Sequence, residues 1–157
     1  KFFLVPKFSQ MKKLFAILLA TLGLSLAISA QDGPSVVPNM DPNAPDIKFE
    51  TEVLDYGTVD YDSNGIREFK FTNTGKSPLM ITSVTGECGC TATTIDGKKG
   101  WPEEPVLPGK SGVIKVKYDT KREGRFEKNV TVTSNAKYAV KKVRIKGEVK
   151  PKPVSAN

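Results

Sequence analysis

The chain has 157 residues, of which 38% are hydrophobic and 26% charged, and this suits one globular domain of ordinary size. Its net charge is +7, but four of the lysines fall in the first thirty residues, which contain no Asp or Glu. Without these four lysines the chain has 20 Lys and Arg against 17 Asp and Glu, a net charge of +3. An excess this small affects solubility and does not indicate a nucleic-acid partner.

Residues 11–30 have the layout of a secretory signal peptide: a methionine, two lysines, an apolar run over 14–28 and a small-residue end at Ala30. The apolar run is shorter than the roughly 20 residues that span a bilayer. We therefore expect cleavage after Ala30, no membrane span after cleavage, and a periplasmic or secreted protein of the bacterial envelope. The alternative is an uncleaved N-terminal anchor. Residues 1–10 precede the methionine and are interpreted as an upstream translation artefact.

Two polar segments flank the candidate domain. Residues 31–46 contain four prolines and three aspartates and cannot bury a core, so they are predicted to form a disordered linker. Residues 151–157 are predicted to form a flexible tail. Residues 47–150 remain as the one candidate domain.

Within this domain apolar and polar side chains alternate, which is typical of strands with one buried and one exposed face. Strands are predicted, in chain order, over residues 46–50, 52–57, 67–73, 79–84, 113–119, 129–135 and 142–149. No ten-residue stretch of the mature chain shows helical spacing. The residues on the inward phase, and therefore the expected core, are Phe69, Phe71, Ile114, Val116, Val130, Val132, Val143 and Ile145.

Turn signals separate the strands at residues 63–65, 73–75, 108–109 and 134–135, where Ser, Asn, Pro and Gly gather. Seven short strands with turns between them, in roughly 100 residues, predict an all-β fold: a seven-stranded antiparallel immunoglobulin-like sandwich. A small closed barrel is the main alternative.

These strands and turns carry a family resemblance. The runs FTNTGKSPLMITSVTGECGCT, VLPGKSGVIKVKYDTKREGRFEKNVTVTSN and VRIKGEV resemble the bacterial family called domain of unknown function 1573. The resemblance implies a secreted or periplasmic Ig-like domain, related to abnormal-spindle/Hydin and PapD-like domains, whose members mostly bind other proteins. It implies no reaction. Its most specific parts are the Cys88-Gly89-Cys90-Thr91 motif, the Pro108-Gly109 turn, Gly124 and the Ser134-Asn135 pair.

The composition excludes several enzyme classes. The chain has no histidine, so Ser-His-Asp and Cys-His nucleophiles and His-rich metal sites are ruled out. Two carboxylate pairs, Asp60 with Asp62 and Glu103 with Glu104, lie in polar, turn-like stretches where nothing indicates burial. We therefore predict no enzymatic activity, no catalytic residues and no cofactor.

Trp101 is the only tryptophan and lies in the loop sequence KKGWPEEPVLPG. A loop tryptophan can be a recognition residue, or it can cover the open end of a small β core. The packing role is favoured, because one aromatic side chain covers a large apolar area.

Cys88 and Cys90 are the only cysteines and have four interpretations. Residues i and i+2 of an extended strand lie about 6.6 Å apart, near the upper limit for a disulfide, so a bridge requires a bend that Gly89 permits. A disulfide is favoured in an oxidising compartment. The alternatives are reduced thiols packed as small hydrophobic groups, disulfide exchange, and a metal site. That site would hold Cu(I), helped by Met80, or would pool four thiolates in a dimer.

Two function hypotheses follow. The leading one is an exported, non-enzymatic Ig-like binding or structural module, whose partner is another envelope protein or surface component. The second is a thiol protein that acts in copper handling or disulfide exchange through Cys88 and Cys90. No oligomeric state is predicted.

Overall fold

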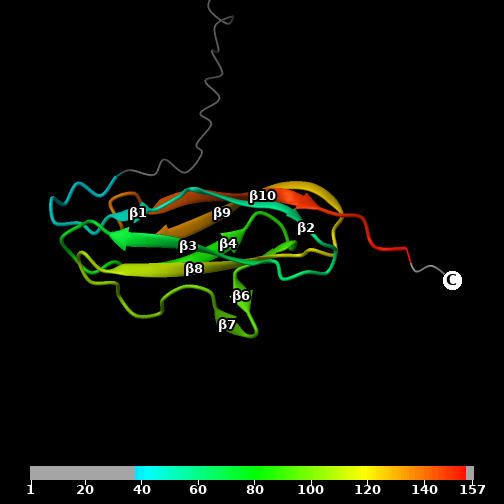
Figure 1. The fold of residues 1–157 in the computed structure, drawn as a ribbon. Coiled ribbons are helices and arrows are strands. Elements are labelled where there is room, and N and C mark those ends of the chain that lie inside the picture. The colour runs from blue at the N-terminus through cyan, green and yellow to red at the C-terminus, as the bar shows by residue number, and fades with distance from the viewer. Residues whose placement is uncertain (1–37, 155–157) are drawn as a thin grey trace, which may run out of the picture. The chain divides into compact units, whose positions relative to one another are not determined.

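The computed structural model describes residues 38–154, and these form a sandwich of two four-stranded sheets with a short additional hairpin (Figure 1). The predicted signal peptide and its cleavage point lie outside the described residues. Within 38–154 no helix is long and apolar enough to cross a membrane. The strands are β1 (Ile47–Phe49), β2 (Val53–Val59), β3 (Ile66–Asn73), β4 (Ile81–Gly86), β5 (Thr91–Ala92), β6 (Thr94–Ile95), β7 (Lys98–Lys99), β8 (Ser111–Tyr118), β9 (Gly124–Ser134) and β10 (Val140–Val149).

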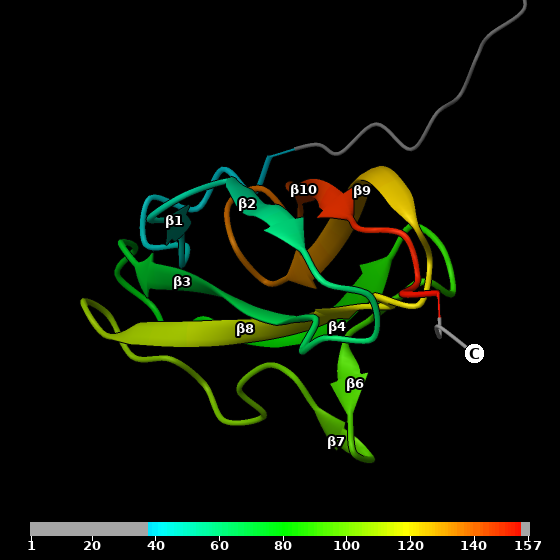
Figure 2. The same ribbon diagram turned by 45° about the vertical axis from the view of Figure 1, so that its right-hand side comes forward.

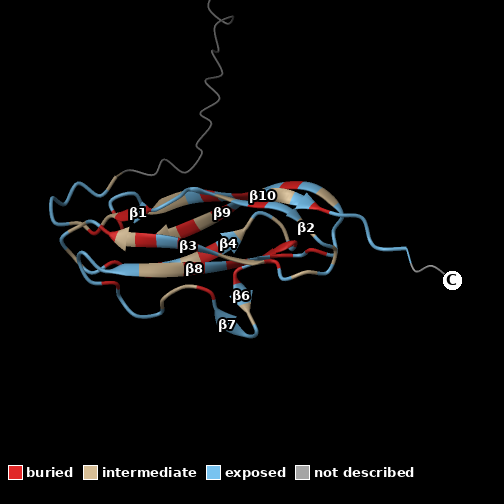
Figure 3. Cartoon of the chain, in the orientation of Figure 1, coloured by how far each residue is buried: buried red, intermediate tan, exposed pale blue. Residues whose placement is uncertain are grey.

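The core lies between the two sheets. Sheet A has the strand order β1–β3–β8–β5, and sheet B has the order β2–β10–β9–β4. Buried positions alternate with exposed ones along the long strands (Figure 3). Each of the seven predicted strands is present, and all eight predicted core residues are at most 2% exposed. The alternation of apolar and polar residues therefore predicted the core correctly, and with it which face of each strand points inward.

The prediction of seven antiparallel strands is wrong in two respects. The described chain has ten strands, because residues 91–99 add β5 and the hairpin β6–β7, which projects from the edge of sheet A (Figure 2). These strands have two residues each, too few to show an alternating pattern. In addition, β2 pairs with β10 in the parallel direction, with an irregularity between Lys146 and Glu148.

The end of the predicted linker, residues 38–46, is held against the sandwich. The backbone N–H of Asn39 donates to the carbonyl of Lys137 (2.8 Å), and the N–H of Lys137 donates to the carbonyl of Pro45 (2.7 Å). Pro45 is buried against Gly75, where a Cβ would lie 2.5 Å from the Pro45 Cα. The disordered linker predicted over 31–46 therefore extends too far toward the domain. The proline-rich composition of this segment gave no sign that residues 38–46 bond to the sandwich.

Asn73, at the end of β3, is fully buried and organises one end of the sandwich. Its Nδ2 donates to the carbonyls of Ser77 (2.8 Å) and Val106 (2.9 Å). Its Oδ1 accepts from the backbone N–H groups of Asp46 (3.3 Å) and Gly75 (3.0 Å). One side chain thus ties the entry of β1, the β3–β4 turn and the loop before β8 together.

Candidate functional site

The segment between β4 and β8 contains the three side chains that the sequence singled out, Cys88, Cys90 and Trp101. It leaves β4 at the edge of sheet B and reaches β5 at the edge of sheet A. After the β6–β7 hairpin, Gly100 returns to this edge and accepts a hydrogen bond from the N–H of Lys115 (2.6 Å). The candidates therefore follow one edge of sheet A and do not form a single cluster.

Cys88 and Cys90 form a close pair where the chain crosses from sheet B to sheet A. Their Cα atoms lie 5.2 Å apart, a separation compatible with the predicted disulfide. Cys90 is buried in the core and Cys88 is half-buried beside it. Gly89 has no positive φ, and a Cβ there would meet no atom within 4 Å. The bend that brings the pair together therefore does not depend on glycine, contrary to our sequence argument.

Met80 cannot join the cysteine pair in a copper site. It lies before the first residue of β4, whereas the cysteines follow the last, so about 20 Å of strand separates them. Within residues 38–154 no group of three or more His, Cys, Asp or Glu is placed to hold a metal ion. The Cu(I) site with Met80 as a ligand is therefore wrong. The dimer that pools four thiolates stays a hypothesis.

Trp101 lies at the base of the hairpin, half-buried against the edge of the core. The Lys99 ammonium is 6.0 Å from the centroid of its ring. Trp101 therefore combines a packing contact against the core with a lysine ammonium near the face of its ring.

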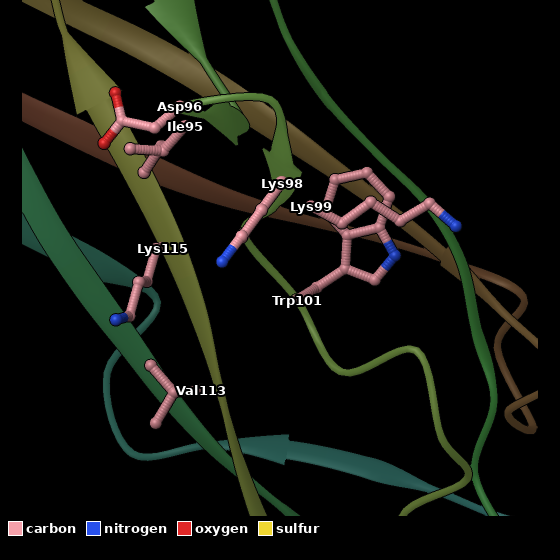
Figure 4. A pocket seen from close by; sticks show the side chains of 8 residues that line it. Ile95, Asp96, Lys98, Lys99, Trp101, Val113 and Lys115 are labelled. Atoms are coloured by element: carbon pink, nitrogen blue, oxygen red, sulfur yellow. The ribbon is translucent and has the colours of Figure 1, made fainter.

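A hollow of about 470 Å³ lies between the hairpin and β8. Figure 4 shows side chains of its lining, with Lys98 from the hairpin and Lys115 from β8. Three lysines and one carboxylate line it, but Lys99 pairs with Glu103 and Lys115 with Glu68, so within the described chain Lys98 is the lining lysine that has no ion-pair partner. The lining residues are Ile95, Asp96, Lys98, Lys99, Gly100, Trp101, Val113 and Lys115.

The four carboxylates considered in the sequence are exposed, and three of them belong to surface ion pairs. Asp60 pairs with Lys150 (2.8 Å) and Asp62 with Lys121 (3.7 Å). Glu103 pairs with Lys99 (3.3 Å) within its own loop. Exposed pairs of this kind contribute about 0–1 kcal/mol each, and their side chains do not converge on a shared site.

In the described chain, two carboxyl groups have lowered pKa values and a buried tyrosine has a raised one, so all three move away from neutral pH. The backbone N–H of Gly57 (2.8 Å), and then Lys146, lower the pKa of Asp55. The backbone N–H and the side chain of Asn129 lower the pKa of Glu87. General acid–base catalysis favours a pKa near the working pH, and these surface hydrogen bonds instead favour the ionised form of both carboxyl groups.

Burial raises the pKa of Tyr56 to about 12 from its ordinary value of 10.0, and Arg67 beside its ring opposes the shift. The unfolded chain therefore loses this proton at lower pH than the folded chain. We expect the free energy of unfolding to fall between pH 10 and 12, by up to about 2–3 kcal/mol from this group. Urea titrations at steps of pH should show a smaller fall in Tyr56→Phe. An equal fall in both proteins would contradict the assignment.

The family model for the protein of unknown function DUF1573 matches residues 47–149. The chain belongs to this family. Membership confirms the resemblance seen in the strands, the turns and the Cys88–Thr91 motif. Among curated proteins, none matches the chain.

Two solved structures are similar in fold to this DUF1573 domain. A protein of unknown function from Porphyromonas gingivalis W83 is 16% identical over 68% of this chain and 48% of its own, with a TM-score of 0.56. The chain thus spans about half the length of that protein. The ASH/PapD-like domain 7 of human CEP192 is 7% identical over 82% of this chain and 100% of its own, with a TM-score of 0.54. At these identities the likeness shows an Ig/PapD-like sandwich and nothing about a partner.

Proposed function

We propose that this chain is an exported, non-enzymatic module that binds another protein of the bacterial envelope. The observation that carries the proposal is the hollow beside the hairpin and β8, where Lys98 has no ion-pair partner among the described residues. The fold supports it by analogy, since Ig-like sandwiches often serve as binding modules. The pKa shifts support it too, because they prepare no acid or base for neutral pH.

Cross-linking in intact cells of the source bacterium tests the binding function. An amine-reactive cross-linker should join the tagged protein to one defined envelope protein, in an adduct that saturates as the cross-linker is increased. Exposed lysines other than Lys98, such as Lys110 and Lys117, supply the reactive amines, so the adduct does not require the Lys98 amine itself. Only uncross-linked protein at every concentration would contradict the proposal.

Export has a separate test. Protein recovered from the envelope should have the mass of a chain that begins at Gln31, because the small-residue end of the signal places cleavage after Ala30. A membrane-bound chain that begins at Met11 would contradict export by cleavage and would favour the uncleaved anchor.

A second candidate function, disulfide exchange, rests on the position of the cysteine pair. Gly89 is exposed and Cys88 is only half-buried, so a small thiol can approach this bend. Exchange catalysis requires more than access, because the pair must also be readily reduced.

We expect the pair to be a structural disulfide. Its two-residue spacing closes a very small loop, which constrains the unfolded chain little. Replacing both Cys88 and Cys90 by serine should therefore lower the free energy of unfolding by only about 1–2 kcal/mol. A thiol count on unfolded protein from the envelope should find no free thiol before reduction. Two free thiols, or reduction at a potential well above roughly −300 mV, would favour the exchange function.

A further inference from the structure

One side of β8 is only partly covered. Its other side pairs with β3 from Ser111 to Lys117, whereas β5 reaches only its C-terminal end. In an antiparallel ladder the N–H and C=O of one residue point to the same side, and successive residues alternate. The N–H groups of Lys115 and Asp119 bond toward the β5 side, to the carbonyls of Gly100 and Cys90. The odd-numbered residues of β8 therefore face this side.

Ser111 and Val113 accordingly direct their backbone N–H and C=O toward this free edge. No residue among 38–154 forms a backbone hydrogen bond with them there. The covering chain leaves the edge after Gly100, and Pro102 has no N–H with which to continue the pairing. The result is a short length of open strand beside the hollow.

The charged side chains at this edge indicate which kind of strand could pair with it. Lys98 and Lys70 have no ion-pair partner among the described residues, and Lys70 lies directly across from Val113. Lys115 pairs with Glu68 at 3.6 Å, and both side chains are about half exposed. Lysines on an edge strand repel a second copy that carries the same lysines. They attract a strand that carries carboxylates.

We propose that the edge of β8 at Ser111 and Val113 binds an extended, acidic segment of a partner polypeptide, which adds to sheet A as a strand. This rests on the proposed binding function and names the chemistry of its partner. Strand addition draws affinity from main-chain hydrogen bonds and specificity from alternate side chains. Here the backbone of Val113 provides the hydrogen bonds, and the unpaired Lys98 and Lys70 provide the preference for carboxylates.

The peptide acetyl-DVTVDVD-amide is a suitable probe, with acetyl-KVTVKVK-amide as its charge-reversed counterpart. Because Trp101 is the only tryptophan, its fluorescence reports on the hollow directly. The acidic peptide should change this fluorescence saturably and shift the amide NMR signal of Val113. The lysine peptide should bind at least about tenfold more weakly. Equal binding of the two peptides, or no shift at Val113, would overturn the proposal.

Variants separate the backbone and charge contributions. Val113→Pro removes the N–H that faces the free edge and leaves the β3 ladder intact, so peptide binding should be lost. Lys98→Glu, on the exposed hairpin, should weaken binding of the acidic peptide at least about tenfold. This variant keeps the test decisive if Val113→Pro does not fold. Lys142→Glu makes the same charge change at an exposed position on sheet B and should bind as wild type.

Cross-linking in cells distinguishes this inference from the broader function. If wild type and Lys98→Glu give the same envelope adduct in equal amount, the protein binds a partner but not through this edge. If wild type gives no adduct, the binding function itself fails.

Discussion

Replacing Phe71 by alanine is expected to lower the free energy of unfolding by about 3–5 kcal/mol, at the upper end of the usual range for a core truncation. Phe71 is fully buried and its ring packs over Gly112, the residue directly opposite on β8. Gly112 has no side chain that could move into the space left behind. The ring of Phe49, with its centroid 6.0 Å away, would lose one of its two aromatic partners as well. Urea unfolding of the two proteins measures the difference.

Matched controls lie on the exposed faces of the same sandwich. Lys115→Ala and Arg144→Ala each remove one exposed ion pair and should change the free energy of unfolding by less than about 0.5 kcal/mol. If these variants proved as costly as Phe71→Ala, the assignment of inward and outward faces would be wrong.

Asn73→Ala should be nearly as destabilising, with an expected loss of about 3–5 kcal/mol. The substitution removes four hydrogen bonds at once. The carbonyl of Val106, a residue that is 8% exposed, then keeps only the N–H of Leu79 as a donor. Thermal or urea unfolding tests the prediction, and a loss below about 1 kcal/mol would show that water replaces the amide without difficulty.

Asn135→Ala is the matched control for Asn73. Its side chain also bonds across a turn, accepting from the N–H of Met80 (2.8 Å) and donating to the carbonyl of Pro78 (3.1 Å). Asn135 is exposed, however, so water can satisfy both groups after the substitution. Its expected cost is about 1 kcal/mol or less.

The core could be predicted from sequence because its signal is local. Val130 and Val132, like Phe69 and Phe71, alternate with polar neighbours, and one buried face is enough to produce that pattern. The partners of the strands could not be predicted in this way. The parallel pairing of β2 with β10 depends on the path of the chain between the sheets, which no short window of sequence contains.

Asn73 shows why other features were missed. In the sequence it belongs to an Asn-Thr-Gly turn, which is typical of an exposed loop. Its burial depends on the loop that carries Val106, 33 residues away along the chain. The β6–β7 hairpin was missed although it has a turn signal at Asp96 and Gly97, because its strands are too short to alternate.

The candidate site was predicted only in part. The sequence singled out Trp101 and the close pair Cys88 and Cys90, because single aromatic residues and cysteines are conspicuous. It gave no sign of the free edge at Val113, since an open edge is defined by the absence of a neighbouring strand. It also gave no sign that Lys98 and Lys115 line one hollow, because the two residues are brought together only by the fold.

The account is tested most directly by cross-linking two variants in cells that produce the protein. It predicts that the double variant with serine at Cys88 and Cys90 keeps the envelope adduct of the wild type, because the pair has a structural role. It predicts that Lys98→Glu loses most of that adduct, because the edge of β8 binds the partner. The opposite result, loss of the adduct in the serine variant and retention in Lys98→Glu, would contradict the account and assign the function to the cysteines.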